Sequence, residues 1–235
     1  MIDLAERQSI GNKIGARMGG AIVKGKYQPG ELLPTEFELT RLFGVGRSTV
    51  REAIKLLAAK GLVSSRRRDG TRVTEHEFWN LLDPDVLQWL QETDYSHQLL
   101  FELAQTRLAI EPEACAIVAH RRSRVDFSPM DQALVEMDKE GAGEEGILQA
   151  DLDFHLGILD ATANRFFINM KPLVATTLRF GFELIDLYKL DQHGNTNDHR
   201  VLFDAMIDGD PERARKIARD MTHQIEIKLR PLVGR

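Results

Sequence analysis

One set of side chains in this sequence has the types and spacing to hold a metal ion. Asp151 and His155 are four residues apart, and His199 follows in a later segment. Residues four apart share one face of a helix, and the neighbouring positions on this face are leucines. A carboxylate and two imidazoles converging inside a helical bundle suit a divalent ion, with open positions for water or a ligand. Spacing alone leaves the plainer alternative open, in which core-facing histidines are satisfied by hydrogen bonds.

Arg107 is a second unusual residue, because it interrupts an apolar stripe at helical spacing. The stripe consists of Leu100, Leu103, Ile110, Ala114 and Ile117. A buried guanidinium needs an anionic partner, which is Glu111 one turn on, Glu102 or a bound carboxylate. The simpler alternative is an ordinary pair of Arg107 and Glu111 at the surface.

A third set is basic and lies near the N-terminus. It comprises Arg47, Ser48, Thr49 and Arg51 at the start of an expected helix, and Arg66, Arg67, Arg68 and Arg72 around Gly70 in an expected hairpin. Arginine at the start of a helix that enters the major groove can fork onto guanine or phosphate, and hydroxyls add phosphate contacts. Glycine allows a tight hairpin tip close to DNA. Taken one at a time, these arginines could simply form a solvent-exposed charged face. Their joint pattern favours a surface that binds nucleic acid.

The charge distribution agrees with this separation of roles. The 235 residues carry a formal net charge of −5. Residues 1–75 contain 14 lysines and arginines against 8 acids, so they carry +6, and the remaining 160 residues carry −11. The asymmetry predicts a basic module that meets an anion, joined to an acidic body.

The elements that must position the basic residues are short. Helical periodicity predicts helices over 10–24, 35–42 and 48–61, the second opened by a capping box of Thr35 and Glu38. Runs at 62–65 and 71–73 are prone to form strands. Helix, turn, helix and a basic hairpin are the plan of a winged helix-turn-helix.

The rest of the chain is predicted to be helical. The expected helices cover 99–119, 129–139, 147–161, 166–188, 197–207 and 211–229. The segment 166–188 is apolar almost all round, which predicts the central helix of a bundle. The fold is therefore expected to be mainly α, with a winged helix-turn-helix in 1–75, a linker in 76–96 and an all-α antiparallel bundle in 97–235 that binds effector and dimerises.

Composition excludes several classes of protein. No segment approaches the run of about 20 apolar residues that a membrane span needs, and the N-terminus has no signal-like apolar region. The single cysteine, Cys115, excludes a disulfide framework and a multi-cysteine zinc site. The expected location is the cytoplasm, in association with the nucleoid.

The basic half resembles a known family. The matching segments are YQPGELLPTE (27–36), GVGRSTVREA (44–53) and KGLV (60–63), which are similar to the DNA-binding domain of GntR-family regulators. The resemblance implies operator contacts from Arg47, Ser48, Thr49 and Arg51, with Gly70 at the wing tip. Many members have an arginine that contacts DNA where this chain has Phe37, so the resemblance does not carry over an operator sequence.

The acidic half resembles the FCD effector domain of the FadR subfamily. The resemblance lies in 83–90, in Glu102, Arg107 and Glu111, and in ADLDFH (150–155) and DHRVLFDA (198–205). It implies metal ligands at Asp151, His155 and His199 and an effector carboxylate at Arg107. Zn²⁺ is the first choice of metal, with Ni²⁺ or Mn²⁺ as alternatives. Members with a further histidine have it where this chain has Met221, expected on an apolar face with Ile217 and Ile225, so His223 is a possible fourth ligand only if the last helix is shifted.

The segment 79–89 resembles the linker of sugar-acid sensors such as galactonate regulators. The resulting hypothesis is a homodimeric repressor of a sugar-acid or related carboxylate operon. It binds a near-palindromic operator and leaves it when a small carboxylate binds near the metal. The alternative is a metal-dependent hydrolase or isomerase acting on a small hydroxy acid, which lacks an evident separate base or nucleophile.

Overall fold

The structure is a computed structural model that describes residues 4–66, 69–91, 97–139, 141, 143–188 and 196–233. The chain forms two compact units, Met1–Asp94 and Tyr95–Arg235. Among the described residues, no helix has both the length and the apolar character needed to cross a bilayer.

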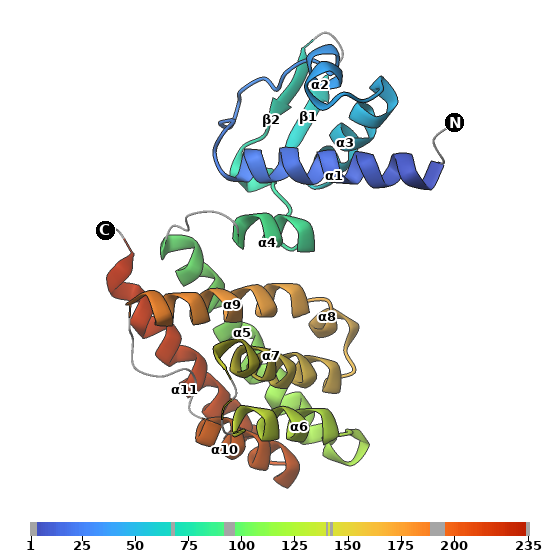
Figure 1. Cartoon of the computed structure of the whole chain (residues 1–235). Helices are drawn as coiled ribbons and strands as arrows, with labels where there is room; N and C mark the ends of the chain where they lie inside the picture. The colour runs from blue at the N-terminus through green and yellow to red at the C-terminus, as the bar shows by residue number, and fades with distance from the viewer. Residues whose placement is uncertain are drawn as a thin grey trace. The chain divides into compact units, whose positions relative to one another are not determined.

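The N-terminal unit is a winged helix-turn-helix (Figure 1). Its elements are α1 (Leu4–Val23), α2 (Glu36–Phe43), α3 (Arg47–Ala59), β1 (Val63–Arg66), β2 (Gly70–Val73), the 3-10 turn η1 (His76–Phe78) and α4 (Pro84–Gln91). The capping box predicted for Thr35 and Glu38 is present at the start of α2, and Gly44 ends that helix in the left-handed region. The two strands pair antiparallel, with Val63 opposite Val73 and Arg66 opposite Gly70.

The expected linker, 76–96, contributes structure to the N-terminal unit. Helix α4 packs on α1, where a Cβ at Gly19 would overlap the ring of Trp89. Lys60 reaches Oδ1 of Asp83 at 2.6 Å and Oδ2 of Asp85 at 2.8 Å, which ties the start of α4 to the end of α3. This segment therefore contributes Trp79, Val86 and Trp89 to the core of its unit.

The C-terminal unit is an all-helical bundle (Figure 1). Its elements are α5 (His97–Arg121), η2 (Arg122–Arg124), α6 (Ser128–Met137), α7 (Glu144–Ala161), α8 (Arg165–Ile168), α9 (Lys171–Tyr188), α10 (Thr196–Asp208), α11 (Pro211–Leu229) and η3 (Arg230–Leu232). Helix α5 contacts α7, α9, α10 and α11, so it occupies the middle of the bundle.

Two sequence expectations for this unit were wrong. The single helix expected over 166–188 is two helices, α8 and α9, because Pro172 has no N–H to continue the ladder and suits a first turn. The central helix is α5 rather than this segment. The turn α8 also exposes Phe166, with 73% of the residue's surface accessible, so the apolar character of the segment overstated the burial of its first turn.

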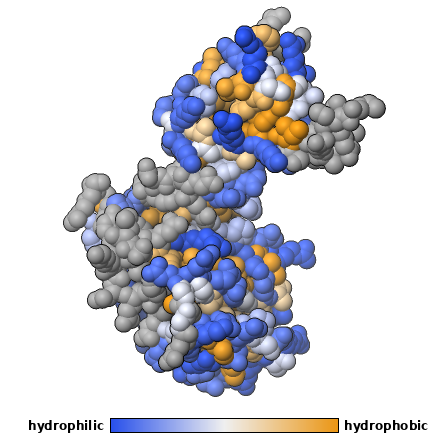
Figure 2. Space-filling model, viewed as in Figure 1, coloured by the Kyte–Doolittle hydropathy of each residue, from blue (hydrophilic) through white to orange (hydrophobic). Residues whose placement is uncertain are grey.

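Hydrophilic side chains cover most of the described surface of the C-terminal unit that Figure 2 shows, while hydrophobic side chains gather on part of the visible surface of the N-terminal unit. Large apolar residues are indeed exposed in that unit, among them Leu32, Phe37 and Leu42. An exposed apolar group on a helix-turn-helix unit is a candidate contact surface.

Candidate metal centre and nucleic-acid interface

The first turn of α3 presents polar and cationic side chains to solvent. Arg47, Ser48 and Arg51 are exposed, whereas Val50 on the opposite face is buried in the core of the unit. Arg51 donates from Nε to both carboxylate oxygens of Glu36, at 3.0 and 3.1 Å. Thr49, expected beside the arginines, is buried instead, because its position on the helix is on the side of Val50 and Ala53.

The wing carries Arg66 exposed on β1, opposite Gly70, whose φ of +82° allows the reversal of the chain. Arg72 is anchored to the protein, because its Nη1 donates to the carbonyl of Gly30 at 2.6 Å and its Nη2 lies 3.4 Å from Asp69. Arg67 and Arg68, expected at the tip, lie outside the described residues.

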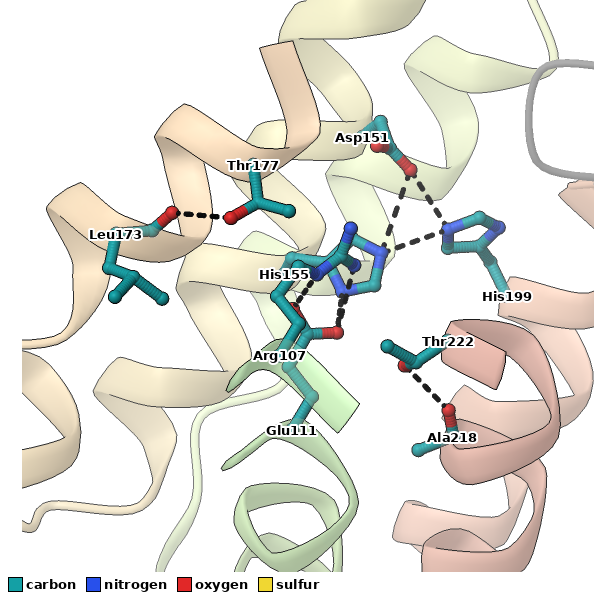
Figure 3. A network of polar contacts seen from close by, with 9 residues as sticks. All are labelled: Arg107, Glu111, Asp151, His155, Leu173, Thr177, His199, Ala218 and Thr222. Carbon is teal, nitrogen blue, oxygen red and sulfur yellow. Dashed lines mark hydrogen bonds and ion pairs between the residues drawn. The ribbon is translucent and has the colours of Figure 1, made fainter. Parts of the chain in front are cut away.

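Three of the predicted ligands converge in the C-terminal unit. Asp151 and His155 come from α7 and His199 from α10, and Figure 3 shows the three side chains pointing toward one another. Oδ1 of Asp151 lies 3.0 Å from Nε2 of His199 and 3.7 Å from Nε2 of His155, and the two Nε2 atoms are 3.3 Å apart. The i, i+4 spacing on α7 therefore places both ligands as the sequence predicts.

The donor set fits one divalent cation. Atoms bound to a single ion at ligand distance are roughly 2.9–3.6 Å from one another, from octahedral to tetrahedral geometry, close to the separations seen here. If Nδ1 of His155 carries the proton, Nε2 of His155 is a hydrogen-bond acceptor, like the carboxylate of Asp151. A single proton on Nε2 of His199 must then serve both acceptors. A cation between the three atoms satisfies all of them. Asp151 keeps 20% of its side chain exposed, so the group has an opening to solvent.

Glu111 on α5 forms the next layer of this site. Its Oε2 lies 3.0 Å from Nδ1 of His155, although the ring is not turned well enough for an aligned hydrogen bond. A carboxylate beside the outer nitrogen of a ligating histidine fixes the ring and directs the inner nitrogen to the metal. Sequence reasoning considered Glu111 only as a partner of Arg107, and its one-turn spacing gave no sign of a contact with α7.

Arg107 and Glu111 form a buried bidentate pair, not the surface pair that was the simpler expectation. Nη2 of Arg107 donates to Oε2 at 2.9 Å, Nε donates to Oε1 at 2.5 Å, and both side chains are almost fully buried. Glu102, the other acid considered, accepts instead from Gln98. Two guanidinium nitrogens are thus committed to Glu111.

Electrostatics keeps both acids of the site ionised. Burial raises the pKa of the Glu111 carboxyl, but the charge of Arg107 and the nearby His155 outweigh burial and hold that pKa well below its ordinary value. Burial likewise raises the pKa of Asp151, yet its histidine partners and Arg107 bring it below the usual range. Both groups are therefore carboxylates at neutral pH.

The last helix does not bring His223 to the group. His223 is exposed on α11 and lies 3.2 Å from Glu226, and the metal-ligand group in the described chain contains only Asp151, His155 and His199. The buried face of α11 is Ala214, Ala218 and Thr222, whereas Met221 is only partly buried, so the expected apolar face was one residue off. Figure 3 shows Thr222 beside the group, with its hydroxyl donating to the carbonyl of Ala218 at 2.8 Å.

Comparison with known proteins gives two family matches. The family described as bacterial regulatory proteins, gntR family, matches residues 11–73, and the FCD domain matches residues 102–224. The HTH-type transcriptional regulator YieP of Escherichia coli K12 is 33% identical over 91% of this chain and 92% of its own length. The galactonate operon transcriptional repressor of the same organism is 32% identical over 89% of this chain and 92% of its own length.

Among solved structures, the Lar protein of Listeria monocytogenes matches 94% of this chain and 96% of its own, with a TM-score of 0.63 at 20% identity. This likeness supports the fold: an N-terminal helix-turn-helix unit followed by an all-helical domain.

Proposed function

The chain belongs to the GntR family of bacterial regulatory proteins and carries an FCD domain, and we propose that it releases its operator when a sugar acid binds at a metal-assisted site. Membership makes it a DNA-binding transcriptional regulator. The alternative of a metal-dependent hydrolase or isomerase is not supported, because the family matches and the named relatives are regulators of transcription and not enzymes.

The observation that carries the proposal is the convergence of three ligand atoms beside a buried arginine. Arg107 carries one positive charge and Glu111 and Asp151 one negative charge each, so the cluster with neutral imidazoles carries one net negative charge. A divalent cation held by Asp151, His155 and His199 makes the cluster net positive, which favours an anionic effector. When bound, the ion supplies a Lewis-acid position for the carboxylate and adjacent hydroxyl of a hydroxy acid.

The identity of the ion follows from the donor types. Two imidazoles and one carboxylate suit Zn²⁺ first, and Ni²⁺ or Mn²⁺ in an octahedral site completed by other oxygen ligands. With three protein ligands, at least one position remains for water or effector. The proposed role of Arg107 is to hold the effector carboxylate through Nη1, the nitrogen that Glu111 does not engage.

A polyhydroxylated acid is favoured over a long acyl chain. The relative at 32% identity is named for a galactonate operon. Thr177 on α9 and Thr222 on α11 are buried on two helices that pack on α5, and each hydroxyl donates to a carbonyl of its own helix, at 2.9 and 2.8 Å. Each of these oxygens retains acceptor capacity, which the hydroxyls of a sugar acid can use and an alkyl chain cannot.

For operator binding, we propose that the exposed Arg47, Ser48 and Arg51 contact bases and phosphates in the major groove, and that Arg66 follows the backbone from the wing. Thr49 is buried, so we assign it a role in packing the helix and not in contacting DNA. Two copies of the chain as a homodimer would read the two halves of a near-palindrome. Effector binding then favours a dimer geometry in which the recognition helices no longer match the half-site spacing, which makes the protein a repressor.

A ligand panel tests the proposal. Thermal unfolding is followed for the metal-free protein and for protein loaded with Zn²⁺, each with a panel of aldonates, hexuronates and fatty acids. A sugar acid at about 100 times its Kd is expected to add about 2.7 kcal/mol of stability, and only to the loaded protein. Stabilisation by a fatty acid alone, or equal stabilisation without metal, would contradict the proposal.

A further inference from the structure

Phe37 is a large apolar side chain that is exposed to solvent beside a cation. It lies in the first turn of α2, and 56% of its surface is exposed. The guanidinium of Arg41, one turn later, lies over the ring at 5.9 Å from its centre. The ring therefore stands at the surface with a positive charge on one side.

The first turn of α2 is fixed beside the DNA-facing turn of α3. Glu36, the residue before Phe37, receives Nε of Arg51 at 3.0 and 3.1 Å. The capping box holds the same turn from its other side, since Glu38 accepts from the backbone N–H of Thr35 at 2.8 Å. Phe37 thus lies in a helix turn whose backbone the capping box orders, one residue after the glutamate that contacts Arg51, the arginine expected to read the operator.

An exposed aromatic ring beside an arginine has a natural partner in the major groove. Phosphates pair with the cations, and the only apolar group that base pairs present there is the C5-methyl of thymine. We propose that Phe37 is a specificity-determining residue that packs on a thymine methyl group in each operator half-site. The contact takes the place of an arginine contact and makes thymine, not guanine, the preferred base at that position.

The test removes one methyl group at a time. The full-length protein selects its strongest duplex from a random-sequence library, and each thymine of that duplex is then replaced by deoxyuridine, which lacks only the C5-methyl. At one position in each half-site we expect the wild type to lose about fourfold in affinity, the value of burying one methyl-sized group. Phe37→Ala should bind the parent duplex about fourfold more weakly and be insensitive to deoxyuridine at that position.

Three further variants make the result specific. Phe37→Leu keeps an apolar contact and should retain sensitivity to the methyl group. Phe37→Arg should select guanine at that position. Phe166→Ala removes a phenylalanine of the C-terminal unit that is even more exposed, at 73%, and should change neither measurement.

The proposal is overturned if wild type and Phe37→Ala respond alike to deoxyuridine at every position. It is also overturned if Phe37→Ala leaves the DNA affinity unchanged and instead alters the oligomeric state, because the ring would then be a protein contact. Circular dichroism of each variant checks that the exposed substitution leaves the fold intact.

Discussion

Arg51 and Arg107 are both paired with a glutamate, one in each unit, yet their surroundings differ completely. The side chain of Arg51 is 67% exposed beside Glu36, whereas that of Arg107 is 3% exposed beside Glu111. An exposed pair contributes little to folding and can exchange one partner for another, whereas removing one member of a buried pair leaves an uncompensated charge. The basic unit therefore keeps its charges available for DNA, and the bundle fixes its charges as part of the fold.

The same comparison applies to the contacts inside the proposed sensing site, which are fully connected. Arg107 holds Glu111, Glu111 lies against His155, and His155 shares its inner nitrogen with Asp151 and His199. In the proposed function, a carboxylate that binds Arg107 acts on Glu111, which lies against one of the proposed metal ligands. The proposal therefore predicts coupling between effector and metal.

The largest effect is expected from breaking the buried pair. Glu111→Gln removes the anion beside Arg107 and should lower the free energy of unfolding of the C-terminal unit by about 3–5 kcal/mol. Chemical denaturation followed by circular dichroism measures this loss. Glu113→Gln, two residues along α5, breaks a partly exposed pair with Arg215 and should have a much smaller effect. Equal losses in both variants would remove the distinction between the two kinds of pair.

The next effect concerns the metal. His199→Ala deletes one of the three proposed ligands, so the variant should lose the stabilisation of about 2.7 kcal/mol expected for the wild type with Zn²⁺ at 100 times its Kd. Calorimetric titration with Zn²⁺ and thermal unfolding both report the change. His223→Ala removes an exposed histidine of α11 and should bind like the wild type. Loss of binding in that control instead would mean that α11 supplies a ligand.

The smallest effect on folding is expected from a substitution in the N-terminal unit, where the affinity for DNA should change instead. Arg51→Ala should cost about 1–3 kcal/mol in affinity for the selected operator while leaving the unfolding transition unchanged. Fluorescence anisotropy measures the affinity. Arg213→Ala removes the same charge from an exposed pair in the other unit and serves as the control. A large fall in stability in Arg51→Ala would show that the exposed arginine is structural.

Part of the site was predictable from local periodicity. Helical spacing alone predicted that Asp151 and His155 share one face and that His199 lies on the face of Leu202 and Met206, whereas the resemblance to the FCD domain implied that the three converge. The contact of Glu111 with His155 was not predictable, since it joins two helices whose relative rotation the sequence does not encode locally.

The errors in the fold have similar causes. A stripe of large residues around Met221 suggested the buried face of α11, but small residues such as Ala218 and Thr222 face inward there. Small side chains allow helices to pack closely, and hydrophobicity alone does not identify that face. The break between α8 and α9 was readable from Pro172, whereas the docking of α4 depends on the fit of Trp89 at Gly19.

Release of the operator by effector tests the central claim most directly. Anisotropy of the complex with the selected duplex is followed while the best sugar acid of the panel is added, with Zn²⁺ present or removed by chelator. The account predicts that the wild type dissociates only with metal present and that His199→Ala stays bound at every concentration. Dissociation of that variant at the wild-type midpoint, or of the chelated wild type, would contradict it.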